Sequence, residues 1–225
     1  QSNNSVFEFD TNNLPAFIKI FDETITRDGR DVSTIDSYAF DVSDTGVIVG
    51  TTSPAAYAVD DPDQSEGNSD KDDPFYVYDY SQRAMIIDNG VIKTFAPDFS
   101  TYGGQSGITA INDNGLVVGY ASVGLENDAR TRIDTVCLDS YKDTVPLQVC
   151  AAGFSDGSRR NTAVQYYLHA YSWEYSNGEL TNPKDLGILT SPINDNDADS
   201  YNSIALDVNN NGIAVGRSKT FRDQK

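Results

Sequence analysis

Three stretches of this chain share one pattern, and that pattern decides the fold: AFDVSDTGVIVG at 39–50, ITAINDNGLVVG at 108–119 and ALDVNNNGIAVG at 205–216. Each joins two apolar runs through three turn-favouring residues and a glycine. Because Asn and Asp tolerate left-handed backbone and glycine adopts positive φ at little cost, each stretch predicts a tight antiparallel hairpin. The expected turn glycines are Gly46, Gly115 and Gly212. The glycine that closes each stretch is expected where strands crowd or bend.

A second phrase follows the first two stretches: RAMIIDNGVIKTF at 83–95 and HAYSWEYSNGELTNPKDLGIL at 169–189. Its Asn-Gly pairs place Gly90 and Gly178 in two further hairpin turns. A first phrase joined to a second makes four antiparallel strands in a meander, which is the plan of a β-propeller blade. The predicted fold class is all-β, with antiparallel four-stranded meander repeats in a β-propeller-like arrangement that is partial or is completed between molecules.

We expect a single repeat domain over 1–225 with four parts: a half unit and linker at 5–38, a first unit at 39–107, a second unit at 108–204 and a half unit at 205–225. Each full unit carries an insertion between its two phrases. The first, at 51–82, is acidic, and the second, at 120–168, holds both cysteines. Insertions on one kind of connection emerge on one face of a propeller, where repeat proteins usually carry recognition.

The N-terminal segment VFEFDTNNLPAFIKIFD at 6–22 matches a further second-phrase hairpin, so the phrases add up to three blades. Three blades are too few to close a ring. Three arrangements stay open: a fragment of a longer propeller, a ring completed by a second copy of the chain, and an open arrangement. In the last two, terminal hairpins of neighbouring molecules would pair, and a rotation that does not close gives a filament.

The composition narrows the classes of function. The 225 residues include 34 acidic and 16 basic side chains, for a formal net charge of −18. This balance excludes an ordinary nucleic-acid-binding domain, because clustered Lys and Arg hold phosphate backbones. No apolar run approaches the length of about 20 residues that a membrane-spanning helix needs.

The chain has two cysteines, Cys137 and Cys150, separated by a polar loop that contains proline. We expect a disulfide rather than a redox or metal pair, because no CxxC spacing occurs and the chain has one histidine. Such a bridge would contribute about 3 kcal/mol by restricting the unfolded chain, and it implies an oxidising compartment. The sequence therefore predicts a secreted or cell-surface protein.

The two phrases resemble the HAF-type extracellular repeat family of bacterial proteins. Its pattern is Ala-x-x-Ile/Val-Asn-x-x-Gly-x-Val-Val-Gly followed by His-Ala-Phe-x-Trp and, later, Leu-Gly. The closest matches are Ala110–Gly119 and His169–Trp173, with Leu186-Gly187 after them. The chain departs from the pattern at Ala110, which lacks the two-residue spacing before Ile111, and in the first unit at Arg83–Ile87. The resemblance implies an exported or surface protein with propeller-like repeats, and it implies no chemistry.

His169 is the only histidine, so histidine-dependent catalysis would have to use it. The first unit has Arg83 in its place, and a permanently charged guanidinium cannot act as a general base. We therefore interpret His169 as a polar residue at a strand edge and assign no catalytic residue.

Calcium is the one ligand that the sequence suggests, because hard cations take oxygen ligands from acidic loops. The candidate ligands are Asp195, Asp197 and Asp199 in one segment and Asp61 and Asp63 in another. Neither segment matches an EF-hand loop, and a solvated acidic loop is the simpler interpretation of each.

These features favour a non-enzymatic bacterial module for binding or structural assembly at or outside the cell surface. Its partners would be copies of itself through the terminal hairpins, another surface protein or a glycan. Two alternatives stay open. One is an extracellular hydrolase of polysaccharide or peptide with its site on the insertion face, and the other is a calcium-dependent adhesin.

Overall fold

The computed structural model describes backbone and side chains for 37–52, 82–95, 104–125, 130–131, 133–139, 166–189 and 202–218. It describes the backbone alone for 5–8, 16–19, 26–27, 30–31, 56–59, 75–78 and 140.

The first unit forms a four-stranded sheet. Its strands, in hydrogen-bonding order, are β5 (Ser37–Val42), β6 (Ile48–Thr52), β9 (Arg83–Asp88) and β10 (Val91–Phe95). All three pairings are antiparallel. The two phrases of the unit therefore join through β6 and β9, as the meander prediction requires.

The second unit repeats this arrangement. Its strands, again in bonding order, are β11 (Ser106–Ile111), β12 (Leu116–Leu125), β13 (Tyr166–Ser176) and β14 (Glu179–Gly187). The prediction of antiparallel four-stranded meanders in an all-β chain is thus confirmed.

The remaining strands form two-stranded antiparallel hairpins. They are β15 (Ser203–Val208) with β16 (Ala214–Ser218), β1 (Ser5–Glu8) with β2 (Ala16–Lys19), β3 (Thr26–Arg27) with β4 (Arg30–Asp31), and β7 (Ala56–Val59) with β8 (Phe75–Tyr78). We call β5–β6, β11–β12 and β15–β16 the repeat hairpins, and β9–β10 and β13–β14 the outer hairpins.

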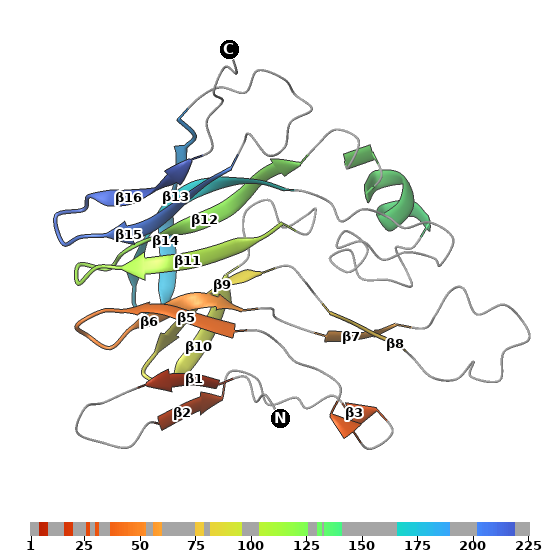
Figure 1. The fold of residues 1–225 in the computed structure, drawn as a ribbon, viewed down its shortest axis with the longest axis horizontal. Helices are drawn as coiled ribbons and strands as arrows, with labels where there is room; N and C mark the ends of the chain where they lie inside the picture. The colour runs from red at the N-terminus through yellow and green to blue at the C-terminus, as the bar shows by residue number, and fades with distance from the viewer. Residues whose placement is uncertain are drawn as a thin grey trace, which may run out of the picture.

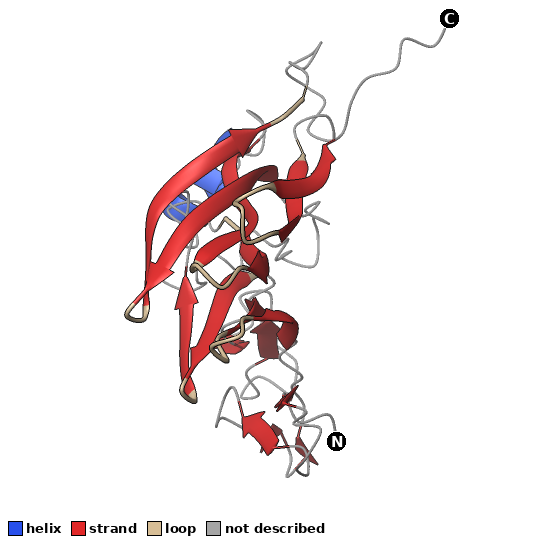
Figure 2. Ribbon diagram, turned by 90° about the vertical axis from the view of Figure 1, so that its left-hand side faces the viewer, coloured by secondary structure: helices blue, strands red, loops and turns tan. Residues whose placement is uncertain are grey.

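The repeat hairpins are stacked in chain order, with β5–β6 below β11–β12 and β15–β16 above (Figure 1). Figure 2 shows the strands as a curved stack of layers seen from the side. The first hairpin, β1–β2, and the last, β15–β16, lie at opposite ends of the stack (Figure 1). The described strands therefore form an open stack rather than a closed ring.

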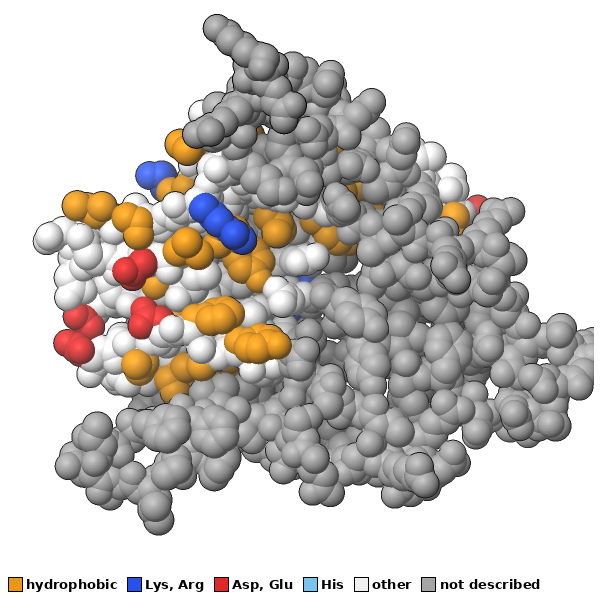
Figure 3. All heavy atoms as spheres, in the orientation of Figure 1, with side chains coloured by type: hydrophobic (Ala, Val, Ile, Leu, Met, Phe, Trp, Pro, Cys, Tyr) orange, Lys and Arg blue, Asp and Glu red, His pale blue; other side chains and the backbone are white. Residues whose placement is uncertain are grey.

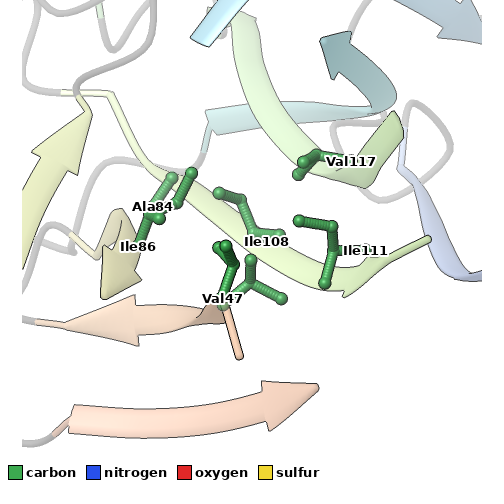
Figure 4. Packing of buried hydrophobic residues seen from close by; sticks show 7 residues of the cluster. Val47, Ala84, Ile86, Ile108, Ile111 and Val117 are labelled. Carbon is green, nitrogen blue, oxygen red and sulfur yellow. The ribbon is translucent and has the colours of Figure 1, made fainter. Parts of the chain in front are cut away.

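Apolar side chains fill the spaces between successive units. Between the first and second units the buried cluster comprises Val47, Val49, Ala84, Ile86, Ile108, Ile111 and Val117, most of which are labelled in Figure 4. Between the second and third it comprises Ala110, Val118, Ala170, Ala205 and Val208. The first and second units therefore each bury an apolar face against the next unit, which is how repeat proteins build a continuous core.

The turns of the repeat hairpins are three-residue loops. In the second, the Asn112 amide donates to the Leu116 carbonyl, and the Gly115 amide donates to the Asn112 carbonyl. The loop is a tight turn closed by a glycine in the left-handed region, which is the usual three-residue solution. Gly46, Gly115 and Gly212 have φ of 85°, 79° and 77°.

The outer hairpins turn through two residues. Asn89 and Gly90 have φ of 49° and 77°, and Asn177 and Gly178 have φ of 52° and 81°. Two successive residues with positive φ define a type I′ turn, whose twist matches that of the flanking strands.

The glycine that ends each first phrase lies where strands crowd, as predicted. A Cβ on Gly50, Gly119 or Gly216 would overlap the backbone carbonyl of the paired strand. The pairing register shifts beside each of these glycines, so one extra residue bulges at Phe40, Thr109 and Leu206. The bulge brings the paired carbonyl close, and only glycine leaves room for it.

Two features differ from the sequence expectation. β12 continues to Leu125 and β13 begins at Tyr166, so the strands extend into the expected insertion 120–168. Within that insertion, Ile133–Ser140 forms a π-helix with Ile133 and Cys137 buried. The short apolar pattern there carries no signal strong enough to predict a helix.

Candidate functional site

The turns of the three repeat hairpins lie beside one another and bond together at one edge of the stack. We call this edge the turn ladder and define it as residues 43–46, 112–115 and 209–212. Between the first two turns, the Asp44 amide donates to Asp113 Oδ1 at 2.9 Å. Just below the turn, the Ile111 amide donates to Asp41 Oδ2 at 2.9 Å.

The second and third turns are joined more densely. Asn112 Nδ2 donates to the Asn209 carbonyl at 2.9 Å, and Asn114 Nδ2 donates to the Asn210 carbonyl at 2.9 Å. The Asp113 amide donates to Asn210 Oδ1 at 3.0 Å, and Asn210 Nδ2 donates back to Asp113 Oδ2 at 2.6 Å. The bonds from the Asp44 amide and from Asn210 lower the pKa of Asp113.

The first residue of each turn also holds its own loop. Asn112 Oδ1 accepts from the amides of Asn114 and Leu116, at 3.0 and 2.9 Å. Asn209 Oδ1 accepts from the equivalent amides of Asn211 and Ile213, both at 3.0 Å. In both turns, the Asn side chain supplies an acceptor to loop amides that lack a backbone partner. This explains why Asn is the first residue of the second and third turns.

A serine fastens each later unit to the outer hairpin of the unit before it. Ser106 Oγ donates to the Phe95 carbonyl at 2.6 Å and accepts from the Ala84 amide at 3.0 Å. Ser203 Oγ does the same with the Gly187 carbonyl and the Ala170 amide, at 2.5 and 2.8 Å. Sequence reasoning missed this pair, although Ser37, Ser106 and Ser203 hold the same place two residues before each first phrase.

The outer hairpins meet through polar groups as well. Tyr175 donates from its hydroxyl to Asp88 Oδ2 at 2.6 Å, and Lys93 Nζ lies 2.9 Å from Glu179 Oε1. Burial, and then the bond to Asp88, raise the pKa of Tyr175 to about 12. The Tyr175 amide donates to the Gly115 carbonyl at 2.8 Å, which ties the outer hairpin to the turn ladder.

Two hollows of about 270 and 360 Å³ open between the first and second sheets at this edge. Asp88, Asn89 and Tyr175 line both of them. Several of the residues that line them, among them Asp88, Asn112 and Tyr175, also bond one repeat to the next.

His169 lies in β13, and its Nδ1 is 2.8 Å from Asp185 Oδ2 on β14. A serine hydroxyl would be needed to extend this pair into a catalytic triad. Ser203, two residues before the third phrase, has its hydroxyl bonded to backbone on both sides and serves as a fastener. Arg83, at the equivalent position in the first unit, is buried and donates to the Gly104 carbonyl.

The other predicted site residues fall largely outside the described part of the chain. Asp61, Asp63, Asp195, Asp197 and Asp199 lie outside it, as does Cys150, while Cys137 is buried in the π-helix. Calcium binding and the disulfide therefore stay predictions. The described residues contain no group of three or more His, Cys, Asp or Glu placed to hold a metal ion.

No helix within the described ranges is long and apolar enough to cross a membrane.

A search of the curated proteins and a search of the solved structures each return no match. A family model does match, over residues 2–225, and its description is a protein of unknown function. The chain therefore belongs to the DUF3466 family, whose function is unknown.

Proposed function

We propose that this chain is a non-enzymatic repeat module of an exported bacterial protein, used for binding or structural assembly at or outside the cell surface. The proposal rests on one observation: the polar residues that recur in the repeats form hydrogen bonds within and between the repeats. Asn112, Ser106 and Ser203 direct their side chains to other repeats or to their own turns. If the repeats were catalytic, the polar residues that they share would be expected at the reaction sites. In this chain, these residues hold the repeats together.

The resemblance to HAF-type extracellular repeats supports the location. The stretch Ile111–Gly119 fits that pattern, and the second phrase follows it at His169–Trp173 with Tyr171 in place of Phe. An excess of acidic over basic side chains also suits a protein that must stay soluble outside the cell. The expected partners are copies of the chain, another surface protein or a glycan.

The test is labelling of intact bacteria that produce the protein, with a membrane-impermeant, amine-reactive cross-linker. We expect the protein to be labelled and to appear in cross-linked adducts with copies of itself or with other surface components. A cytoplasmic protein, labelled only after lysis, is the control. If this chain is likewise protected until lysis, the proposed location and function are wrong.

Calcium is an accessory part of the proposal, because it rests on acidic segments outside the described residues. The measurement is a thermal scan with calcium and with chelator. We expect calcium to raise the melting temperature, since a ligand that binds only the folded state stabilises it. An unchanged melting temperature removes calcium from the proposal.

A further inference from the structure

The strongest unassigned surface lies on the third repeat hairpin, β15–β16. In each of the first two repeat hairpins, one face packs against the next repeat, and we call it the forward face. Its members are Val47 and Val49 in the first hairpin and Leu116 and Val118 in the second. The equivalent residues of the third are Ile213 and Val215. Val49 and Val118 are both 0% exposed, whereas Val215 is 59% exposed and Ile213 is 60% exposed.

A matching surface lies at the other end of the stack. The face that receives the preceding repeat, which we call the backward face, includes Ile111 in the second repeat hairpin and Val208 in the third. These side chains are 5% and 6% exposed, but the equivalent Val42 on β5 is 58% exposed. On the same face of the first repeat hairpin, Ile48, the equivalent of Val117, is 7% exposed and packs with Met85 and Ile87. The described residues therefore expose a forward face on β16 and, around Val42, part of a backward face, of the kinds that pair twice inside the chain. Figure 3 shows hydrophobic side chains at the surface over β5 and over β15–β16.

The polar groups of the turn ladder are incomplete at the same end. Asn112 Nδ2 and Asn114 Nδ2 donate to carbonyls of the next turn, and the Asp113 amide donates to a side-chain oxygen there. In the third turn the corresponding donors, on Asn209, Asn211 and Asn210, have no acceptor among the described residues. The acceptors they need are those of another repeat turn, such as the turn that Ser43 and Asp44 form.

Among the described strands, β16 lacks a partner on its outer side. β6 pairs with β9 and β12 pairs with β13, whereas the described partner of β16 is β15. A groove of about 280 Å³ runs beside β16 and is lined on its other side by Leu186 and Leu189. Unpaired strand edges are templates for another strand.

The β1–β2 hairpin is positioned to fill that groove from a second molecule. In the second and third units the repeat hairpin contacts the outer hairpin of the preceding unit, through β9 with β11 and β13 with β15. β1 contacts β5 in the same way. A second copy whose β5–β6 docks on β15–β16 therefore brings its own β1 to the open edge of β16, which completes a four-stranded sheet.

We propose that the forward face of β15–β16 in one copy binds the backward face of β5–β6 in a second copy, head to tail. The inference rests on the proposed function and names its partner: another copy of this chain. The contact is heterologous, because two different surfaces meet, so it closes into a ring or extends as a stack. It repeats the apolar packing and turn bonding of the two interfaces inside the chain.

The test is sedimentation velocity of the purified 225-residue chain over a range of concentrations, with three variants. Val215→Asp blocks the forward face, and Val42→Asp blocks the backward face. Val91→Asp on β10 is the matched control, because Val91 is also a strand valine with 59% exposure but lies on neither face. Circular dichroism and the fluorescence of Trp173, the only tryptophan, establish that each variant is folded.

We expect the wild type and Val91→Asp to self-associate, and each blocked variant to do so at least about tenfold more weakly, because a carboxylate would be desolvated in the contact. An equimolar mixture of the two blocked variants should form a one-to-one complex, since each retains the face that the other lacks. A monomeric wild type, association that survives both substitutions, or a mixture that does not associate would each overturn the head-to-tail contact.

This measurement is independent of the labelling of intact cells. Head-to-tail association in solution can fail while the protein is still found at the surface, and the reverse can also occur. A monomeric chain at the cell surface would therefore remove the self-contact and leave the proposed function standing.

Discussion

The second and third repeat hairpins have closely similar sequences and very different surroundings. Val118 and Val215 are the same residue at the same place in the phrase, yet the first is 0% exposed and the second is 59% exposed. Among the described hairpins, β11–β12 lies between two neighbours, whereas β15–β16 has a neighbour on one side. The phrase therefore specifies a hairpin with two apolar faces. Whether each face is buried depends on the presence of a neighbouring repeat.

The largest difference between the two hairpins should appear when each valine is replaced by a charged residue. Val118→Asp should lower the free energy of unfolding by about 3–5 kcal/mol, because it buries an unpaired carboxylate. Val215→Asp should change it by less than about 0.5 kcal/mol at concentrations where the chain is monomeric, because the site is exposed. Urea unfolding followed by Trp173 fluorescence measures both.

A similar loss of stability in the two variants would contradict this account of the forward face. It would mean that Val215 is buried in the folded protein by something other than a second copy.

The asparagines that open the turns extend the comparison to polar groups. Asn112→Ala should cost about 1–3 kcal/mol, because Asn112 is 4% exposed and its loss leaves buried groups unpaired. Asn209→Ala should cost about 0.5–1.5 kcal/mol, because Asn209 is exposed and the described bonds of its side chain lie within its own loop. Chemical denaturation of both variants gives the two values.

Asn112→Asp separates the two roles of this side chain. It keeps the acceptor for the loop and removes the Nδ2 donor to the Asn209 carbonyl. If Asn112→Asp is as stable as wild type, the bond between the two repeats contributes nothing.

The serine fasteners should behave alike despite the different exposure of their hairpins. Ser106 and Ser203 are 1% and 3% exposed, and each bonds the preceding unit. Ser→Ala should cost about 1–2 kcal/mol at either position, because a buried carbonyl and a buried amide lose their partner. Thermal or urea unfolding of the two variants should give equal losses, and a clearly smaller loss for Ser203→Ala would show that the third hairpin is loosely held.

The smallest effect is the pH dependence that Tyr175 adds at the contact between outer hairpins. The pKa of Tyr175 is raised to about 12 in the folded chain, from 10.0. Above pH 10 the unfolded chain therefore loses this proton first, and the stability from Tyr175 falls as the pH rises from 10 towards 12. Tyr175→Phe should reduce that slope in unfolding measured across the range, and an unchanged slope would assign it to other tyrosines.

Much of the fold could be predicted from local patterns. Alternating apolar residues place the strands β5, β6, β9 and β10 and those of the second unit, together with Asn-Gly turns and turns of the form Ser-x-x-Gly or Asn-x-x-Gly. The crowding at Gly50 and its equivalents was also predictable, since a glycine inside a strand pattern marks close backbone approach. These are short-range effects of backbone sterics and turn chemistry.

The inter-repeat contacts were not predictable in the same way. Ser106 and Ser203 recur at the same place before a first phrase, but that position does not reveal their partners, which lie on the outer hairpin of another unit. The sequence shows that Arg83 and His169 occupy equivalent positions in the two units, but it does not show their different contacts. Arg83 is buried and donates to the Gly104 carbonyl, whereas His169 pairs with Asp185. Which groups a side chain meets depends on how the sheets stack.

The sequence by itself determined that the chain is made of paired hairpins, where they turn and that their faces are apolar, because these properties depend on residues a few positions apart. Only the tertiary structure decided which faces are buried. Ile213 and Val215 on one end and Val42 on the other remain exposed for a physical reason: hydrophobic burial is a property of two surfaces, and the described stack has one surface at each end.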